Sequence, residues 1–115
     1  MTPKEFTELH NEFVAHEANL LGLKAKEYAA DSDRLWNFHV RAVMEGCRAS
    51  EVALGDLLKH ISSLALAVRT GSGEWAWRTL EGHEGLKQRV ADARNYLLLL
   101  AACLEEERNG ANQLE

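Results

Sequence analysis

Acidic side chains gather where the sequence predicts a break between two helices. Glu27, Asp31 and Asp33 lie close together there, and Asn37 follows about one helical turn later. Crowded carboxylate oxygens suit Mg²⁺, which takes one or two protein carboxylates and completes its octahedron with water and substrate phosphate. An ordinary acidic turn that caps the next helix would contain the same residue types. Both interpretations stay open at this point.

A second acidic residue stands on an apolar face of the last predicted helix. Asp92 shares this face with Tyr96, Leu99 and Cys103, at spacings of three and four residues. A carboxylate that is half buried among such side chains is costly unless it is paired or binds a cation. Asp92 is therefore either bonded to a structural partner, for which Arg89 is available, or a ligand.

One face of the predicted helix over 50–69 differs from an ordinary solvated face. It lies opposite a stripe of leucines and mixes small residues, two aliphatic residues and one acid–base pair: Val52, Gly55, Asp56, Lys59, Ser63 and Leu66. We expect this helix to be sandwiched between its leucine-side neighbour and another helix or another subunit. The alternative is a mildly apolar surface with an exposed ion pair worth about 0.3 kcal/mol.

Other residues carry weaker signals for chemistry. The histidines show no tight metal-binding spacing, which favours structural or surface roles: His10, His16, His39, His60 and His83. The G-S-G segment at 71–73 lacks the lysine and the flanking strand of a phosphate-binding loop. No nucleophile with a neighbouring base is discernible.

Four helices must position these residues. The first opens with a capping box formed by Thr2 and Glu5, and the second carries two apolar stripes that predict burial against more than one neighbour. No strand-like alternation occurs. The sequence predicts an all-α bundle of four helices in a single domain over 1–108, with a flexible C-terminal tail over 109–115. The expected helices cover about 3–28, 34–45, 50–69 and 84–108.

Composition excludes several classes of protein. The chain has 115 residues with a formal net charge of −5 and no basic cluster, so the driving force for binding a phosphate backbone is missing. Two cysteines form neither a disulfide framework nor a zinc motif and fit a reducing compartment. The longest apolar run, 96–104, has nine residues, about half of what a bilayer requires. We expect a cytoplasmic protein without nucleic-acid or membrane partners.

Three segments together resemble a known family. They are K-E-Y-A-A-D-S-D-R-L-W-N-F at 26–38, V-A-L-G-D-L-L-K-H-I at 52–61 and V-A-D-A-R-N-Y-L-L-L at 90–99. Their order and spacing resemble small phage-encoded proteins that are similar to the MazG-like, all-α nucleoside-triphosphate pyrophosphohydrolases. The resemblance covers about residues 24–105. It implies a MazG-like bundle completed as a homodimer or higher homo-oligomer, in a bacterial host cytoplasm.

The same resemblance implies a nucleotide site that holds Mg²⁺ against a triphosphate. Water would attack between the α- and β-phosphorus, releasing a nucleoside monophosphate and pyrophosphate. Asp92 matches the family's last-helix aspartate and would be the foremost metal ligand. The other residues that the resemblance assigns are Glu27 or Asp31 as the second carboxylate, Asn37 as an orienting group, Lys59 as a phosphate contact and Tyr96 as a substrate-binding residue.

The sequence also departs from the catalytic members of that superfamily. It has no E-E-x-x-E cluster, and Arg89 stands three residues before Asp92 where an acid would be expected. Two further hypotheses therefore stay open. One is a protein that binds or sequesters a nucleotide or a nucleotide-derived signal without cleaving it. The other is a helical interaction module whose polar residues are structural.

Overall fold

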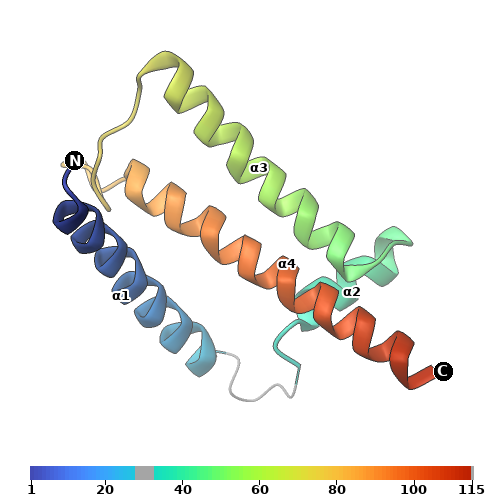
Figure 1. Ribbon diagram of the computed structural model, residues 1–115. Coiled ribbons are helices and arrows are strands. Elements are labelled where there is room, and N and C mark those ends of the chain that lie inside the picture. The colour runs from blue at the N-terminus through green and yellow to red at the C-terminus, as the bar shows by residue number, and fades with distance from the viewer. Residues whose placement is uncertain (28–32, 115) are drawn as a thin grey trace. The chain divides into compact units, whose positions relative to one another are not determined.

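Helices joined by loops make up the part of the chain that the computed structural model describes. This part comprises residues 1–27 and 33–114, with side chains over 1–20 and 33–110. It contains no strand, only an isolated bridge between Arg78 and Glu84. The all-α prediction is confirmed over these residues. The helices are α1 (Pro3–Glu27), α2 (Trp36–Glu45), α3 (Ala49–Thr70) and α4 (Leu86–Leu114) (Figure 1).

The chain divides into two units, Met1–Arg34 and Leu35–Glu115. Helix α1 makes up most of the first unit and begins with the expected capping box. The Thr2 N–H donates to Glu5 Oε2 at 2.7 Å, and the Glu5 N–H donates to Thr2 Oγ1 at 3.1 Å. Two otherwise unsatisfied donors at the helix start are thus paired by local sequence alone.

The second unit contains α2, α3 and α4. Helix α2 begins after Leu35, whose side chain makes no cap hydrogen bond, and Asp33 of the acidic turn stands two residues before this position. The helix ends at Gly46, whose φ of 68° is the left-handed conformation that glycine adopts without strain. Helix α3 follows at once.

The N-terminus of α3 is covered by α4. The Ser50 N–H donates to Glu107 Oε1 at 3.1 Å, which places a carboxylate at the positive end of the α3 dipole. Ser50 itself is buried. Since Ser50 is near the start of α3 and Glu107 near the end of α4, this bond fixes the antiparallel pairing visible in Figure 1.

The core of this unit lies where α2 crosses the paired helices. It is formed by Leu35, Phe38, Ala42, Ala49, Val52, Ala53 and Cys103. One predicted stripe of α2 is therefore buried. The second stripe stays at the surface, because Trp36 is 57% exposed and Val43 is 83% exposed. Helix α2 nevertheless has two neighbours, since Arg41 bonds to Asp56 of α3 and Phe38 meets Tyr96 of α4.

The two predicted faces of α3 are used differently from expectation. On the smaller-residue face, Val52 is buried and Asp56 is partly buried beside α2, whereas Lys59 and Leu66 are exposed. The neighbour at the N-terminal half of α3 is thus α2 of the same chain. Most large residues of the leucine stripe remain exposed, although Leu57 is buried.

The connector between α3 and α4 is held by its own backbone. The Gly85 N–H donates to the Trp77 carbonyl at 2.9 Å, and the Leu86 N–H donates to the Glu74 carbonyl at 2.8 Å. A Cβ on Gly85 would lie 1.9 Å from the Ala76 carbonyl oxygen, so only glycine fits there. The ammonium group of Lys87 lies 5.5 Å from the centroid of a Trp75 ring.

Helix α4 runs further than the sequence predicts. It passes through Asn109 and Gly110 to Leu114, whereas the N-G pair predicts an end at Arg108. Asn-Gly is a helix-stop signal only where the glycine adopts a left-handed conformation, and Gly110 is not among the glycines with positive φ. No described helix has a continuous apolar stretch long enough to cross a lipid bilayer.

Candidate functional site

Polar side chains line the junction of α3 and α4, continuing from the apolar core toward the connector. We call this set the polar seam: Asp56, His60 and Ser63 of α3, Arg89, Asp92 and Tyr96 of α4, and Arg41 of α2. Within each of the two long helices these residues follow at three- and four-residue spacing, so they share one face. The seam brings together groups from all three helices of the second unit.

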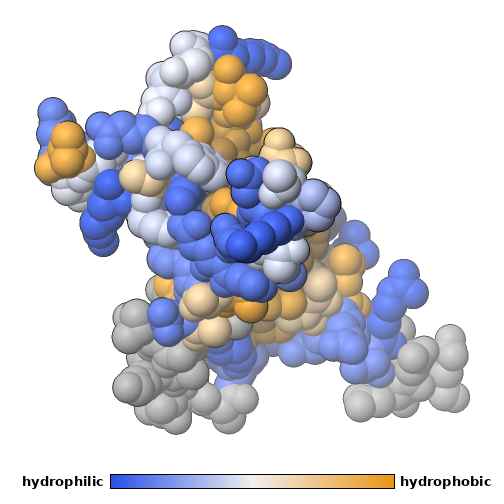
Figure 2. Space-filling view, turned by 60° about the vertical axis from the view of Figure 1, so that its left-hand side comes forward, coloured by the Kyte–Doolittle hydropathy of each residue, from blue (hydrophilic) through white to orange (hydrophobic). Residues whose placement is uncertain are grey.

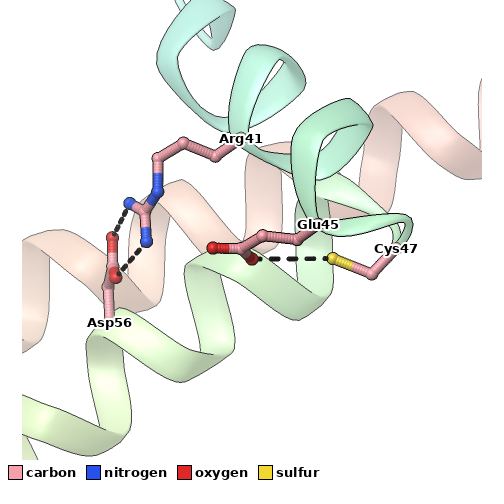
Figure 3. A network of polar contacts seen from close by, with 4 residues as sticks. All are labelled: Arg41, Glu45, Cys47 and Asp56. Carbon is pink, nitrogen blue, oxygen red and sulfur yellow. Dashed lines mark hydrogen bonds and ion pairs between the residues drawn. The ribbon is translucent and has the colours of Figure 1, made fainter.

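Arg41 and Asp56 form the best-defined pair of the seam (Figure 3). The two guanidinium nitrogens donate to the two carboxylate oxygens at 2.7 and 2.9 Å. The Asp56 side chain is only 13% exposed and that of Arg41 is 34% exposed. The hydrogen bond from Arg41 to Asp56 raises the pKa of the guanidinium group against the opposing effect of desolvation. Asp56 is therefore occupied as a structural partner and is not available as a metal ligand.

Tyr96 is clamped between two rings. His60 stacks on it with a centroid distance of 4.8 Å and an interplanar angle of 29°. Phe38 meets it edge-on at 6.5 Å and 85°. Such offset and edge-to-face pairs stabilise a fixed ring orientation. Tyr96 thus links α4 to both other helices, and His60 covers a face that a nucleotide base would need for stacking.

Asp92 has a different environment from Asp56. It is partly buried, and its Oδ1 accepts a hydrogen bond of 2.8 Å from the Gln88 side-chain amide. Arg89, the structural partner that the sequence offers, instead reaches toward Ser63 Oγ at 3.4 Å. Asp92 forms no ion pair with a described residue. Its negative charge is therefore held by a neutral amide in a place where a cation would be stabilising.

The other predicted site residues lie outside the seam. Lys59 is exposed on α3, and its side chain makes no hydrogen bond or ion pair with another described residue. Asn37 is exposed on the first turn of α2, one turn before Arg41. The Glu27 side chain and all of Asp31 lie outside the described residues. The structure therefore places Asp92 and Tyr96 on one face and leaves the predicted second carboxylate untested.

Two residues of the polar seam, His60 and Arg41, were not predicted from the sequence to be functional. In the sequence, His60 is one of five histidines that lack the spacing of a metal-binding motif. It does share a helix face with Asp56 and Ser63, which stand four residues before it and three residues after it. Arg41 lies on the narrow polar side of α2, where its reach to α3 depends on how the helices cross. The i, i+4, i+7 spacing was the available signal for His60.

Close to the seam, Glu45 and Cys47 form a polar contact at the end of α2 (Figure 3). The Cys47 thiol lies 3.9 Å from Glu45 Oε2. Partial desolvation raises the pKa of this thiol, and the negative charge of Glu45 raises it further. Because the thiolate is the reactive form, Cys47 is poorly suited to be a nucleophile.

The chemistry of Asp92 fits a divalent cation in one respect. A carboxylate oxygen is the hard ligand that Mg²⁺ prefers, and Mg²⁺ needs only one or two protein carboxylates when water and phosphate supply the remainder. Comparisons of this chain with protein-family models, with curated proteins and with solved structures gave no match.

Proposed function

We propose that this chain binds a nucleotide through a divalent cation held at Asp92. The observation that carries the proposal is the contrast between the two carboxylates of the polar seam. Asp56 is neutralised by a bidentate arginine, whereas partly buried Asp92 accepts only an amide hydrogen bond among the described residues. A carboxylate that is partly desolvated and lacks a counter-ion favours a cation from solution.

In this proposal Asp92 is the protein ligand of Mg²⁺, with Glu27 or Asp31 as a second carboxylate. Lys59 has an exposed ammonium group one residue from His60, and it would contact phosphate oxygens as a point charge. Asn37 would orient the ligand and Tyr96 would shape the site. When bound, Mg²⁺ neutralises phosphate charge and can lower the pKa of a bound water.

The activity proposed for this site is that of a MazG-like pyrophosphohydrolase acting on a nucleoside triphosphate or related nucleotide. Attack of water at the α-phosphorus would break the bond to the bridging oxygen, giving a nucleoside monophosphate and pyrophosphate. Asp92 and Glu27 are the residues to which this step is assigned. Binding without cleavage needs fewer ligands and is the alternative, because the E-E-x-x-E cluster is missing.

The direct test combines binding and turnover. Purified protein is incubated with each ribo- and deoxyribonucleoside triphosphate, with and without Mg²⁺, and followed by thermal unfolding and by release of pyrophosphate. A ligand at about 100 times its dissociation constant adds roughly 2.7 kcal/mol to the free energy of unfolding. Stabilisation together with pyrophosphate release supports hydrolysis, and stabilisation alone supports binding.

Asp92→Asn is the decisive variant, because it keeps the shape and the partner of the side chain and removes its charge. Glu105→Gln is the matched control, since Glu105 is an exposed carboxylate on the same helix. We expect Asp92→Asn to abolish the Mg²⁺-dependent response and Glu105→Gln to keep it. If Asp92→Asn responds like the parent chain, or if no nucleotide stabilises the parent chain, the proposal fails.

A second candidate function is a helical interaction module. It is favoured by the number of large apolar side chains that stay exposed on α3 and α4, such as Leu58 at 53% and Leu97 at 52%. In this case the polar seam is purely structural. Absence of any nucleotide response together with self-association or partner binding through these side chains would favour this reading.

A further inference from the structure

An uninterrupted apolar stripe runs along the exposed side of α3. Its large members are between 43% and 75% exposed: Leu54, Leu58, Ile61 and Val68, with small, partly buried Ala65 between them. The spacing along the chain is four, three, four and three residues. This is the heptad spacing of a helix seam that packs against another helix.

Helix α4 extends the same surface. Leu97 is 52% exposed and Leu104 is 43% exposed, with exposed Ala101 between them at four- and three-residue spacing. In the face seen in Figure 2, hydrophobic side chains reach the surface in several patches separated by polar ones. We call the α3 and α4 residues together the apolar face.

Both stripes lie on the side of the helix pair that points away from α2. On α3, Asp56 lies on the side toward α2, as its bond to Arg41 shows. Going around the helix from Asp56, the residues that face α4 come next, and the stripe follows about a third of a turn further on, roughly opposite Asp56. On α4, Glu106 marks the side toward α2 through its 2.5 Å contact with His39. Leu97 and Leu104 lie on the other side of that helix. The two stripes therefore form one continuous surface.

The apolar face is as large as the largest apolar patches that monomeric proteins leave exposed. Six large side chains, each about half exposed, offer on the order of 600 Å² of apolar area, counting about 100 Å² for each. A typical monomer's largest apolar patch is about 300–600 Å². A standard interface buries roughly 800 Å² per partner, of which a polar rim supplies a share. The apolar face thus provides nearly the whole apolar centre of such an interface.

The charges at the two ends of the α3 stripe are complementary to those of a second copy of α3 that packs antiparallel to the first. Glu51 stands at its N-terminal end, where its carboxylate also accepts the Arg48 N–H and lies 3.6 Å from the Arg48 guanidinium group, and Arg69 stands at its C-terminal end. Both residues are exposed and lie on the same edge. When two copies of α3 pack antiparallel with Ile61 at the two-fold axis, Glu51 of each copy lies beside Arg69 of the other. An isologous pairing of this kind closes as a dimer.

We infer that the apolar face is the contact surface for a second copy of this chain, with α3 antiparallel to α3 of the partner and Ile61 at the two-fold axis. This surface differs from the one that the sequence suggests. Val52, which the sequence places against another helix or another subunit, is 3% exposed in the chain's own core. The inference does not depend on nucleotide binding.

The test compares neighbouring positions on the same helices. Leu58→Glu and Leu97→Glu place a charge on the apolar face, whereas Leu66→Glu and Leu98→Glu place one at equally exposed leucines off the stripes. Oligomeric state is measured by sedimentation equilibrium at micromolar concentration, and helical content by circular dichroism. We expect a dimer for the parent chain and both controls, and a dissociation constant raised roughly 100-fold by either stripe variant.

A second measurement tests the register. In a Cys47→Ser background, Ile61→Cys should form an intermolecular disulfide with itself under mild oxidation, because the two copies meet there. Leu66→Cys is the control and should stay monomeric on a denaturing gel. A monomeric parent chain, equal effects of Leu58→Glu and Leu66→Glu, or equal cross-linking at positions 61 and 66 would each overturn the inference. A monomeric parent chain is also the result expected if another segment of the same chain covers the apolar face.

Discussion

The two carboxylates of the polar seam occupy similar positions on neighbouring helices and have opposite surroundings. Asp56 lies next to the core, where α2 supplies Arg41 as a bidentate partner. Asp92 lies toward the connector and receives only the amide of Gln88 among the described residues. The position of α2 therefore determines which carboxylate is structural and which has a charge left to interact with something else.

The largest effect is expected at Asp56. Asp56→Ala removes the acceptor and leaves the guanidinium group of Arg41 in a partly buried place without its partner. We expect the free energy of unfolding to fall by about 2–3 kcal/mol, somewhat below the loss for a fully buried pair because Arg41 is partly exposed. Urea unfolding measures this. A loss no larger than that of an exposed control such as Glu105→Ala would contradict the structural role.

A smaller effect is expected where α4 caps α3. Glu107→Ala removes the acceptor of the Ser50 N–H and a negative charge at the α3 N-terminus. The expected destabilisation is about 0.5–1.5 kcal/mol, the size of a lost helix cap. The same urea experiment measures it, with Glu105→Ala again as the control. Raised salt should reduce the difference, because part of it is electrostatic.

Asp92→Asn should scarcely change stability. Its amide can keep a hydrogen bond with Gln88, and no ion pair with a described residue is broken, so we expect a change within about 0.5 kcal/mol. If Asp92→Asn instead costs as much as Asp56→Ala, then Asp92 has a structural charge partner and the contrast between the two carboxylates disappears.

The smallest effect concerns the thiol at the end of α2. The raised pKa of Cys47 means that a smaller fraction of it is thiolate at pH 8 than in a free cysteine, so alkylation by iodoacetamide should be slower. Glu45→Gln removes part of the cause and should speed the reaction. The rate is followed by mass spectrometry, with Cys103 buried in the same chain as an internal reference. A Cys47 rate at or above that of free cysteine would contradict the raised pKa.

Features with a local cause could be predicted from the sequence. The Thr2–Glu5 capping box and the glycine that ends α2 depend on residues within one turn, and both are present. The buried stripe of α2 follows from helical periodicity. These signals need no knowledge of how the helices cross.

The choice of face on α3 could not be predicted in this way. Hydrophobicity ranks the leucine stripe first, yet the residues that face α4 include the small Ala53 and Ala67, and Leu54 and Leu58 stay exposed. Small side chains let two helix backbones approach closely, and such packing adds contacts that a hydropathy pattern does not record. For the same reason the pairing of Arg41 with Asp56 could be read only from the structure.

The connector between α3 and α4 has a practical consequence. Its base is fixed by the close approach of Gly85 to Ala76, whereas Leu80 at its tip is 99% exposed. A fluorophore or affinity tag inserted at the tip would protrude without disturbing the backbone bonds at the base. An insertion at 85 would displace the start of α4 and with it Asp92. The tip of this loop is therefore the natural attachment point for a reporter of ligand binding or of assembly.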